Sequence, residues 1–451
     1  MSYAILAASL RSAMERQDLD AIRLVLDEMQ AADIAEFVRN DEPGVTLALF
    51  EHLSPEDRAE VFGYLEPEHQ LQIARELDDK RLAQLLSNMS SDESADFFNL
   101  LEPGRQESIL RSMARKERDE LRRLSSYAEG TAGAVMTSEY MVVPAQSTAR
   151  EALELIRTRG PDAETIYQIY VLDEQQRIAG TLSLRELILA TPQARIVDIM
   201  TTEVISVGVE TPQEEVARLI ARYDIMTLPI TNGGGRMVGI VTYDDAMDVA
   251  EEEATEDMHK GASVGSIEGG LRHASLGTLY RKRVGWLVLL VFANIFSGMG
   301  IAHFEETIEA YIVLVFFLPL LVDSGGNAGS QAATLMVRGM ATGDVRFRDW
   351  GRLLGKELLV ATGLGLTMAA AVAGLGAFRG GPDIALVVSL SMVLIVIVGS
   401  LIGMCLPFLL SRLKFDPATA SAPLVTSIAD ASGVLVYFGI ATAVLGLPAA
   451  A

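Results

Sequence analysis

One carboxylate inside a long apolar segment is the residue whose chemistry most constrains this chain. Asp430 lies near the middle of residues 421–447, which otherwise have the composition of a transmembrane helix. An ionisable side chain at membrane depth is costly, and it normally faces a bundle interior or a water-filled path. We therefore predict that Asp430 meets a cation.

A second group of carboxylates follows residue 243 and contains almost no basic residue before Lys260. Its members are Asp244, Asp245, Asp248, Glu251, Glu252, Glu253, Glu256 and Asp257. On a continuous helix, spacings of three and four place several of them on shared faces, where like charges repel by about 0.2–0.5 kcal/mol per pair. Clustered carboxylate oxygens with partly hydrated coordination suit Mg²⁺. A solvated acidic linker explains the run equally well at this stage.

Residues 1–130 are predicted to form an acidic, all-α superhelical domain. Similar apolar residues recur every twelve positions, at Leu53, Leu65, Leu77, Met89, Leu101 and Met113. Four of them are followed by Pro, Ser, Asp or Glu residues that suit helix caps and first turns. This pattern indicates short helices stacked in a repeating array. Asp92 and Asp96 project from one helix face. They are either part of a solvated surface or ligands of a metal ion.

Residues 131–255 contain a tandem repeat, with one copy at about 131–197 and the other at about 198–255. Val135-Met-Thr returns as Ile199-Met-Thr, and Arg177-Ile-Ala-Gly returns as Arg236-Met-Val-Gly. The predicted order in each copy is linker strand, helix, strand, turn, strand, helix. This resembles a pair of α/β CBS domains, which usually sense a ligand and often bind adenosine nucleotides. The nucleotide-associated Ser/Thr-x-x-Asp pattern is intact from Thr242 to Asp245, so we expect ATP or a related nucleotide as a candidate ligand there.

Charge is divided unevenly along the chain. The net charge is −23, of which residues 1–270 carry −25 and residues 271–451 carry +2. Such acidity argues against nucleic-acid binding and suits cation binding or solubility. The single cysteine, Cys405, excludes a disulfide framework and a thiolate metal cluster. The first residues lack the pattern of a signal peptide, so the first half is expected in the cytoplasm.

The last part of the chain, residues 284–451, is predicted to be an α-helical transmembrane domain with five spans. The apolar segments are residues 284–303, 310–336, 357–378, 383–410 and 421–447, each long enough to cross a bilayer. Basic residues flank alternate ends, which predicts a multi-pass protein of the cell (inner) membrane with a cytoplasmic N-terminus and an external C-terminus. Between the repeat and the spans, residues 256–283 form a connecting region. Within it, Leu271 to Arg283 is expected to form a short amphipathic helix after a break at Gly269-Gly270.

The second span is expected to be interrupted by the polar, glycine-rich segment from Asp323 to Gln331. Asn327, Gln331 and Thr334 would line a polar path there, although interhelical hydrogen bonding explains each residue singly as well. Gly399-Ser-Leu-Ile-Gly403 is predicted to be a small-residue packing face. At the cytoplasmic edge of the third span, a pore-lining role for Glu357 competes with a capping or snorkelling role.

Taken together, the chain resembles the MgtE magnesium channels over its whole length. The most specific residues of this resemblance are Pro319, Gly325-Gly-Asn-Ala-Gly-Ser-Gln331, Thr334, Arg338, Asp416-Pro-Ala, Pro423, Thr426, Asp430, Gly433 and Tyr437-Phe438. The resemblance implies a homodimer in the lipid bilayer with a pore on its two-fold axis, Asp430 as the pore carboxylate and Thr426 as a further lining residue. It implies regulatory Mg²⁺ sites at Asp92, Asp96, Asp224, Asp245, Asp248, Glu253, Glu256 and Asp257. It also implies that the helix from Leu271 to Arg283 plugs the pore.

The expected function is passage of largely hydrated Mg²⁺, because Mg²⁺ releases its water reluctantly. High cytosolic Mg²⁺ would bridge the acidic residues of the first half and close the pore. Two alternatives remain open, namely transport of Co²⁺ or another divalent cation, and a non-conducting, membrane-anchored metal or nucleotide sensor. An enzyme is not expected, because the chain has no phosphate-binding Gly-x-x-x-x-Gly-Lys loop and its five histidines are scattered.

Overall fold

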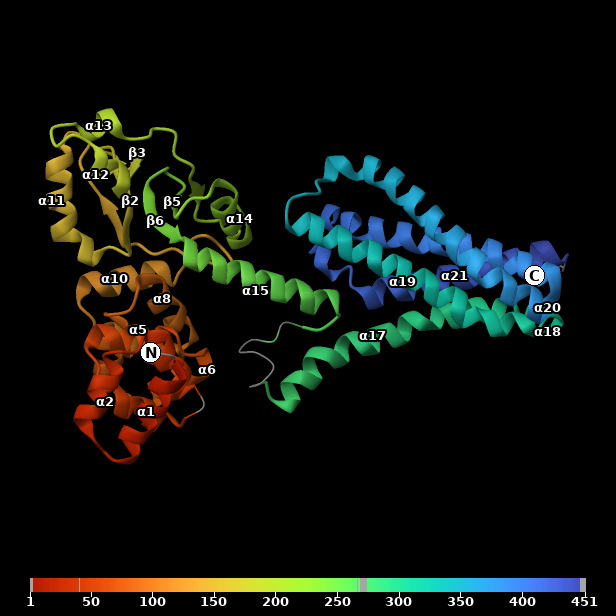
Figure 1. The fold of residues 1–451 in the computed structure, drawn as a ribbon, viewed down its shortest axis with the longest axis horizontal. Coiled ribbons are helices and arrows are strands. Elements are labelled where there is room, and N and C mark those ends of the chain that lie inside the picture. Colours follow the sequence, from red (N-terminus) through yellow and green to blue (C-terminus); the bar gives the residue numbers. More distant parts are fainter. Residues whose placement is uncertain (1–2, 40, 266, 268–273, 447–451) are drawn as a thin grey trace. The chain divides into compact units, whose positions relative to one another are not determined.

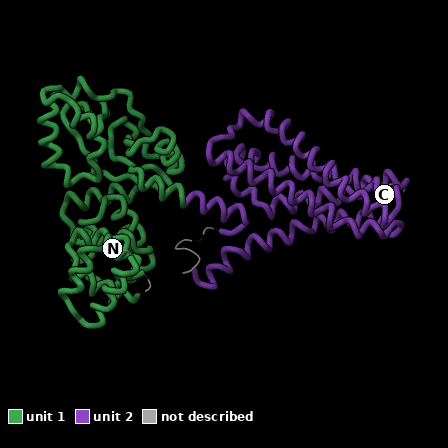
Figure 2. The backbone as a smooth tube through the Cα atoms, viewed as in Figure 1, with its two compact units in different colours: residues 1–251 green, residues 252–451 purple. Residues whose placement is uncertain are grey.

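The chain forms two compact units, residues 1–251 and residues 252–451 (Figure 2). The computed structural model describes residues 3–39, 41–265, 267 and 274–446. The boundary between the units falls within one helix, α15 (Tyr243–Gly261). Each unit is described on its own below.

The first unit begins with a run of short helices (Figure 1). They are α1 (Tyr3–Glu15), α2 (Leu19–Leu26), α3 (Ala31–Val38), α4 (Pro43–Phe50), α5 (Pro55–Gly63), α6 (Pro67–Glu76), α7 (Asp79–Leu86), α8 (Ser91–Leu100), α9 (Pro103–Ser112) and α10 (Arg115–Leu124). From α4 to α10 the helices begin twelve residues apart. The predicted helical array is therefore confirmed.

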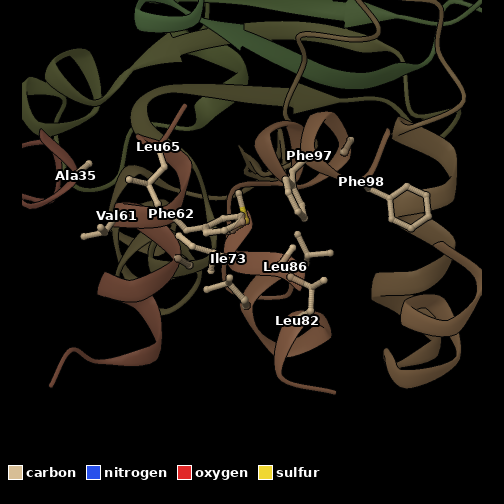
Figure 3. Close-up of a cluster of buried hydrophobic side chains, with 14 of the residues drawn as sticks. Ala35, Val61, Phe62, Leu65, Ile73, Leu82, Leu86, Phe97 and Phe98 are labelled. Carbon is tan, nitrogen blue, oxygen red and sulfur yellow. The ribbon is translucent and has the colours of Figure 1, made fainter. Parts of the chain in front are cut away.

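Local capping explains this periodicity. Proline occupies a first-turn position of α5, and Ser54 accepts a hydrogen bond from the amide of Asp57 at 3.0 Å. At α7 the carboxylate of Asp78 accepts a hydrogen bond from the amide of Arg81 at 2.8 Å. Of the apolar residues between helices, Leu65, Met89, Leu101 and Met113 are buried, as are the core side chains labelled in Figure 3, while Leu53 and Leu77 are partly buried and pack against the same core. Each repeat thus contributes one helix and one inward-facing turn to a continuous core.

Two three-stranded sheets follow, with the same topology. The first contains β1 (Tyr140–Val142), β2 (Thr165–Leu172) and β3 (Ile178–Ser183), and the second contains β4 (Val207–Gly208), β5 (Thr227–Thr231) and β6 (Met237–Thr242). In each sheet the first pair is parallel and the second is antiparallel. The accompanying helices are α11 (Ala149–Arg159), α12 (Leu184–Leu189) and α13 (Ile196–Ile199) in the first copy, and α14 (Gln213–Tyr223) and α15 in the second. The predicted repeat of strand and helix order is confirmed.

The two copies are joined to each other and to the helical array. The hydroxyl groups of Tyr170 and Thr227 lie 2.7 Å apart in the buried interior, and the amide of Thr137 donates to the carbonyl of Ile240 at 2.9 Å. One hydrophobic core runs from the helical array into the second copy. The acidic side chains of the first unit are therefore carried on one continuous scaffold.

The second unit is helical. It contains α17 (Leu276–His303), α18 (Glu305–Ala310), α19 (Val313–Ala341), α20 (Trp350–Arg412) and α21 (Ala422–Leu445), with short 3₁₀ turns η2 (Phe347–Asp349) and η3 (Pro417–Thr419). Among the described residues, four helices are long and apolar enough to cross a membrane. The longest, α20, breaks at Gly381, where φ is 82°. Its two arms fold onto each other, since a Cβ atom on Gly376 would lie 2.9 Å from the Cα atom of Ala385.

The predicted interruption of the second span is wrong. Helix α19 continues without a break from Val313 to Ala341, through the whole glycine-rich segment. The glycines serve close helix contact instead, because a Cβ atom on Gly329 would lie 2.7 Å from the carbonyl oxygen of Gly399. A Cβ atom on Gly403 would lie only 1.9 Å from the carbonyl oxygen of Gly329. The predicted packing face from Gly399 to Gly403 is confirmed.

The prediction of a separate helix from Leu271 to Arg283 is also wrong for residues 274–283, which the structure describes. Helix α17 begins at Leu276, and Ser275 caps it by accepting a hydrogen bond from the amide of Thr278 at 3.0 Å. Nothing breaks the helix before His303, so the basic residues around Lys282 belong to the same helix as the first apolar segment. The predicted break at Gly269-Gly270 lies outside the described residues.

Candidate cation path and acidic cluster

The carboxylate of Asp430 lies beside a glycine of the neighbouring helix. Asp430 is half-buried on α21, and its Oδ1 atom is buried without a hydrogen-bond partner among the described residues. A Cβ atom on Gly326 of α19 would lie 3.5 Å from that oxygen and 2.9 Å from the Cγ2 atom of Thr426. Gly326 therefore leaves the carboxylate room that a larger residue would fill.

Helix α19 carries a polar stripe along one side. We give this name to Asp323, Asn327, Gln331, Thr334 and Arg338, all exposed in the single chain. At 100° per residue these positions fall within an arc of about 80°. The amide of Asn327 donates to the carboxylate of Asp323 at 2.9 Å. A polar face on an otherwise apolar helix is expected to meet water or another protein surface in a bilayer.

The predicted lining residues differ in their surroundings. Asn327, Gln331 and Thr334 all lie in the polar stripe, whereas the hydroxyl of Thr426 lies 3.2 Å from that of Ser330 and helps join α21 to α19. Glu357 is half-buried on α20, and no hydrogen bond joins it to the polar stripe in the part of the chain that the structure describes. Sequence reasoning did not single out Asp323 as a site residue. A second carboxylate in an apolar segment, four residues before Asn327, could have revealed it.

The first unit contains five carboxylates with raised pKa values, which we call the acidic cluster. They are Asp92, Glu93, Glu139, Glu164 and Asp245. Asp92 is buried and Glu139 and Asp245 are half-buried, whereas Glu93 and Glu164 are exposed to solvent. Burial raises the pKa of every one, to about 7 for Glu93, Glu139 and Asp245 and to about 8 for Glu164. The charge of Asp92 adds to the effect of burial in the last four. Asp92 itself is 8% exposed, and its Oδ1 atom has no hydrogen-bond partner among the described residues.

The scaffold brings the acidic cluster together from three parts of the chain. Helix α8, which carries Asp92 and Glu93, is bound to the segment before β1 because the hydroxyl of Ser91 accepts a hydrogen bond from the amide of Ser138 at 2.9 Å. The amide of Glu164 donates to the carbonyl of Glu139 at 2.7 Å. At the start of α15, the hydroxyl of Thr242 donates to Asp245. In the described part of the chain no three His, Cys, Asp or Glu side chains are positioned to ligate a metal ion directly.

The other predicted regulatory residues are more dispersed. Burial and the neighbouring Glu251 raise the pKa of Asp248 on α15. Asp96 lies on α8 with Asp92, and Asp224 ends α14 in a left-handed conformation with φ 51°. Sequence reasoning missed Glu93, Glu139 and Glu164, since nothing in their spacing shows that tertiary structure surrounds them with other carboxylates.

At the far end of α15, Lys260 lies among the remaining predicted acidic residues. Its ammonium group lies 2.8 Å from the carboxylate of Glu256 and 2.6 Å from that of Asp416 at the start of η3. Burial lowers the pKa of Lys260, but these two hydrogen bonds outweigh burial and raise it. Burial and the charge of Asp416 raise the pKa of Asp257, while Glu253 lies one turn before it. Lys260 therefore already joins Glu256 to Asp416 without a metal ion.

Two further contacts hold this end of α15 within the second unit. The hydroxyl of Ser263 donates to that of Ser421, which caps α21, at 2.6 Å. The amide of Gly265 donates to the carbonyl of Lys282 on α17 at 2.9 Å. The acidic helix is thus connected directly to the start of the helix that carries Asp430.

Comparison with known proteins gives the same domain order along the chain. Residues 29–130 match the MgtE intracellular N domain, residues 132–192 and 196–252 match CBS domains, and residues 318–440 match the MgtE divalent cation transporter domain. The chain is 40% identical to the magnesium transporter MgtE of Thermus thermophilus, with 98% of each chain covered. The chain belongs to the MgtE family of magnesium transporters. It is also 34% identical to the MgtE of Bacillus subtilis, with 93% of each chain covered.

A solved structure supports the assignment of the first unit. The cytosolic domain of the Mg²⁺ channel MgtE in complex with ATP is 39% identical, with a TM-score of 0.52, and covers 54% of this chain and 99% of that chain. The resemblance to the MgtE family that the motifs predicted is thus confirmed. Because MgtE proteins are membrane transporters, membership also agrees with the expectation that the chain is not an enzyme.

Proposed function

We propose that this protein is a Mg²⁺-selective channel or transporter whose ion passes beside Asp430. The observation that carries the proposal is the exposed polar stripe of α19, next to a buried carboxylate oxygen that has no partner among the described residues. With the two arms of α20 counted separately, the second unit has five spans. The basic residues at alternate ends support a cytoplasmic N-terminus and an external C-terminus in the cell (inner) membrane.

The pore lies between two copies of the chain. A polar stripe that faced lipid would be costly, and a two-fold axis at this face would place two copies of it, and two Asp430 residues, around one path. A second carboxylate favours a divalent over a monovalent ion, because two negative charges repel each other until a cation neutralises them. The α19 and α21 helices offer too few oxygen ligands for a fully dehydrated ion, so Mg²⁺ passes with most of its water.

The acidic residues of the first half close the pore when cytosolic Mg²⁺ is high. Unit charges about 4 Å apart repel by roughly 4 kcal/mol at an effective dielectric constant near 20, so a compact arrangement of these residues needs bridging cations. Mg²⁺ therefore shifts the equilibrium toward the compact, closed form. The regulatory ligands that we propose are Asp92, Asp96, Asp224, Asp245, Asp248, Glu253, Glu256 and Asp257. Helix α15 carries the signal through Lys260 and Ser263 to the start of α21.

The CBS copies also bind an adenosine nucleotide. This part of the proposal rests on the intact pattern from Thr242 to Asp245, whose side chains are hydrogen-bonded in the structure, and on the ATP complex of a relative's cytosolic domain. ATP binding measured by calorimetry on the wild-type protein and on Asp245→Asn tests it. Equal affinity in the two proteins would remove Asp245 from the site.

The decisive experiment is Mg²⁺ uptake into proteoliposomes that contain a Mg²⁺-sensitive dye. Wild type and Asp430→Ala are compared while the Mg²⁺ facing the first half of the chain is varied. We expect wild-type flux that falls as this Mg²⁺ rises, and loss of flux in the variant. If Co²⁺ competes with Mg²⁺ and gives the stronger flux, Co²⁺ is the substrate. If folded wild type shows no Mg²⁺ flux under any condition, the protein is a non-conducting sensor.

A further inference from the structure

An apolar groove opens at the basic end of the second unit. It is lined by Phe347 of η2, by Trp350 at the start of α20, by Cys405, Phe408 and Arg412 near the end of α20, and by Ile428 of α21. Its volume is about 530 Å³, which is in the range of small-molecule sites. The rings of Phe347 and Phe408 meet edge to face at 6.1 Å and form one wall. Arg412 supplies the positive charge in this lining.

We propose that this groove binds an acyl chain of an anionic phospholipid, with the phosphate of the headgroup at Arg412. The apolar walls suit a hydrocarbon chain, and Trp350 is a residue type that favours the depth of lipid headgroups. Basic pockets between membrane helices bind anionic headgroups, and each nearby Lys or Arg adds to the attraction. The inference concerns lipid and is independent of which ion passes through the protein.

The charges around the groove strengthen this choice of ligand. The exposed basic residues in the segments that flank it are Arg346, Arg348, Arg352, Arg412 and Lys414. None of them forms an ion pair with a carboxylate in the part of the chain that the structure describes. Within the described residues, these cations form no close ion pair and outnumber Asp344 and Asp349 of the same segment, so the end of the helix bundle is suited to a phosphate-bearing lipid surface.

A second copy of the chain fits the groove less well. Two copies related by an axis along the membrane normal have the same ends at the same depth, so contact at this groove would bring Arg412 toward the basic residues of an identical end. Like charges at such an interface oppose association. An anionic lipid can make apolar contacts with the walls and pair its phosphate with Arg412. Another copy of the chain can make only the apolar contacts.

A lipid bound in the groove would contact α21, the helix that carries Asp430. Ile428 lines the groove and stands two residues before Asp430 on α21, while the other walls belong to α20 and the turn before it. A bound acyl chain therefore packs between the ends of these two helices. The lipid is expected to stabilise their relative position at the basic end.

The two tryptophans of the chain provide a direct test, because Trp350 lines the groove and Trp286 lies near the start of α17. The variant Trp286→Phe keeps Trp350 as the only tryptophan. The full-length variant is reconstituted in phosphatidylcholine vesicles that contain increasing amounts of phosphatidylglycerol brominated on its acyl chains. Brominated phosphatidylcholine serves as the neutral probe. We expect the anionic probe to quench Trp350 fluorescence at a mole fraction about fivefold lower than the neutral probe, roughly 1 kcal/mol of preference.

Matched variants separate a groove from general attraction to the basic end. With Trp350→Phe, the remaining Trp286 lies three residues after Arg283 and reports general attraction to the basic end, so its preference for the anionic probe should be smaller than that of Trp350. Arg412→Gln, at an exposed position where folding is little affected, should remove most of the preference at Trp350, and Arg412→Lys should keep part of it. Equal quenching of Trp350 by the two probes overturns the proposal. So does quenching by neither probe together with Cys405–Cys405 cross-links between copies, which would show that a second copy covers the groove.

Discussion

Two buried carboxylate oxygens without hydrogen-bond partners among the described residues, one on Asp430 and one on Asp92, sit in opposite surroundings. Asp430 lies against glycine on a helix whose polar stripe contains one further carboxylate, Asp323. Asp92 lies among four other carboxylates whose pKa values are all raised. A low density of negative charge holds a cation weakly enough to release it, whereas a high density holds it until its concentration falls. Under the proposed function, this difference in charge density would suit Asp430 to ion passage and Asp92 to Mg²⁺ sensing.

Removing the charge of Asp430 should have the largest effect. Asp430→Ala should lower Mg²⁺ flux by more than about tenfold, equivalent to over 1.4 kcal/mol, because Asp430 is the half-buried carboxylate beside Gly326 where α21 meets α19. Initial rates of dye-detected Mg²⁺ and Ca²⁺ uptake measure both flux and selectivity. Unchanged Mg²⁺ over Ca²⁺ preference would place selectivity elsewhere.

Asp323→Asn is the matched control for this comparison. It removes one carboxylate from the polar stripe while keeping the size of the side chain and an acceptor for Asn327. We expect a smaller loss of flux than in Asp430→Asn, since Asp323 is exposed in the single chain whereas Asp430 is half-buried. A greater loss in Asp323→Asn would make the polar stripe, and not α21, the principal cation site.

The glycine contact between α19 and α20 should be essential for packing of the helices that form the proposed ion path. In Gly403→Val the new Cβ atom would lie 1.9 Å from the carbonyl oxygen of Gly329, so the helices must separate. We expect a loss of about 3 kcal/mol or more in the stability of the second unit, measured by thermal unfolding in detergent. Gly439→Val is the control, because nothing lies within 4 Å of a Cβ atom there. Equal melting temperatures for the two variants would mean that the helices are not packed as described.

Much of the fold was predictable from the sequence because its signals are local. The twelve-residue spacing from Leu53 to Met113 follows from caps and turns, and the tandem repeat follows from matching strands and glycines. The error over the segment from Asp323 to Gln331 has a physical cause. Glycine permits both unwinding and close packing, and only the approach of Gly399 on another helix shows which occurs. Among the described residues, four membrane-length helices are found where five spans were expected, because α20 includes two apolar arms that meet at the kink at Gly381.

The candidate sites were predictable only in part. A single carboxylate in an apolar segment identified Asp430 without any tertiary information. By contrast, Glu139 and Glu164 belong to ordinary surface-like sequence, and their raised pKa values come from burial and from residues distant along the chain. Lys260 was likewise missed, since its partner Asp416 lies 156 residues away. Electrostatic clusters are products of tertiary structure, whereas an isolated charge at membrane depth is visible in the sequence.

The stability of the first unit should depend on pH through the acidic cluster, which distinguishes the surroundings of Asp92 from those of Asp430. Carboxylates that ionise at about 4 in the unfolded chain have folded pKa values of about 7 for Glu93, Glu139 and Asp245 and about 8 for Glu164. Their protonated forms therefore stabilise the folded first unit at low pH, and this stability is lost as pH rises through 7 to 8. Without Mg²⁺, we expect the melting temperature of the first unit to fall by about 2–4 °C between pH 5.5 and pH 8.5, roughly 1 kcal/mol, because solvent screens the charges of the exposed Glu93 and Glu164.

Mg²⁺ should restore this stability at pH 8.5 and have little effect at pH 5.5, where protons already neutralise the acidic cluster. Hydrogen exchange of α8 peptides in the full-length protein measures the effect locally. Glu164→Gln should reduce the pH dependence, since it removes the carboxylate whose pKa is raised highest, to about 8. Stability that rises with pH in the absence of Mg²⁺ would contradict the raised pKa values.

The smallest expected effect comes from Lys260, which connects the acidic helix to the start of the helix that carries Asp430. Its ammonium group joins Glu256 to Asp416 without any metal ion, and its side chain is 28% exposed. Lys260→Gln leaves those carboxylates facing each other, so closure should need about two- to threefold more Mg²⁺, a change of under 1 kcal/mol that suits a partly solvated ion pair. The half-inhibitory Mg²⁺ concentration in proteoliposomes measures it. Lys260→Arg should behave as wild type, because it keeps the charge. A lower half-inhibitory concentration in Lys260→Gln would show instead that the ammonium group competes with Mg²⁺ for these carboxylates, and sensing would then extend along α15 to the second unit.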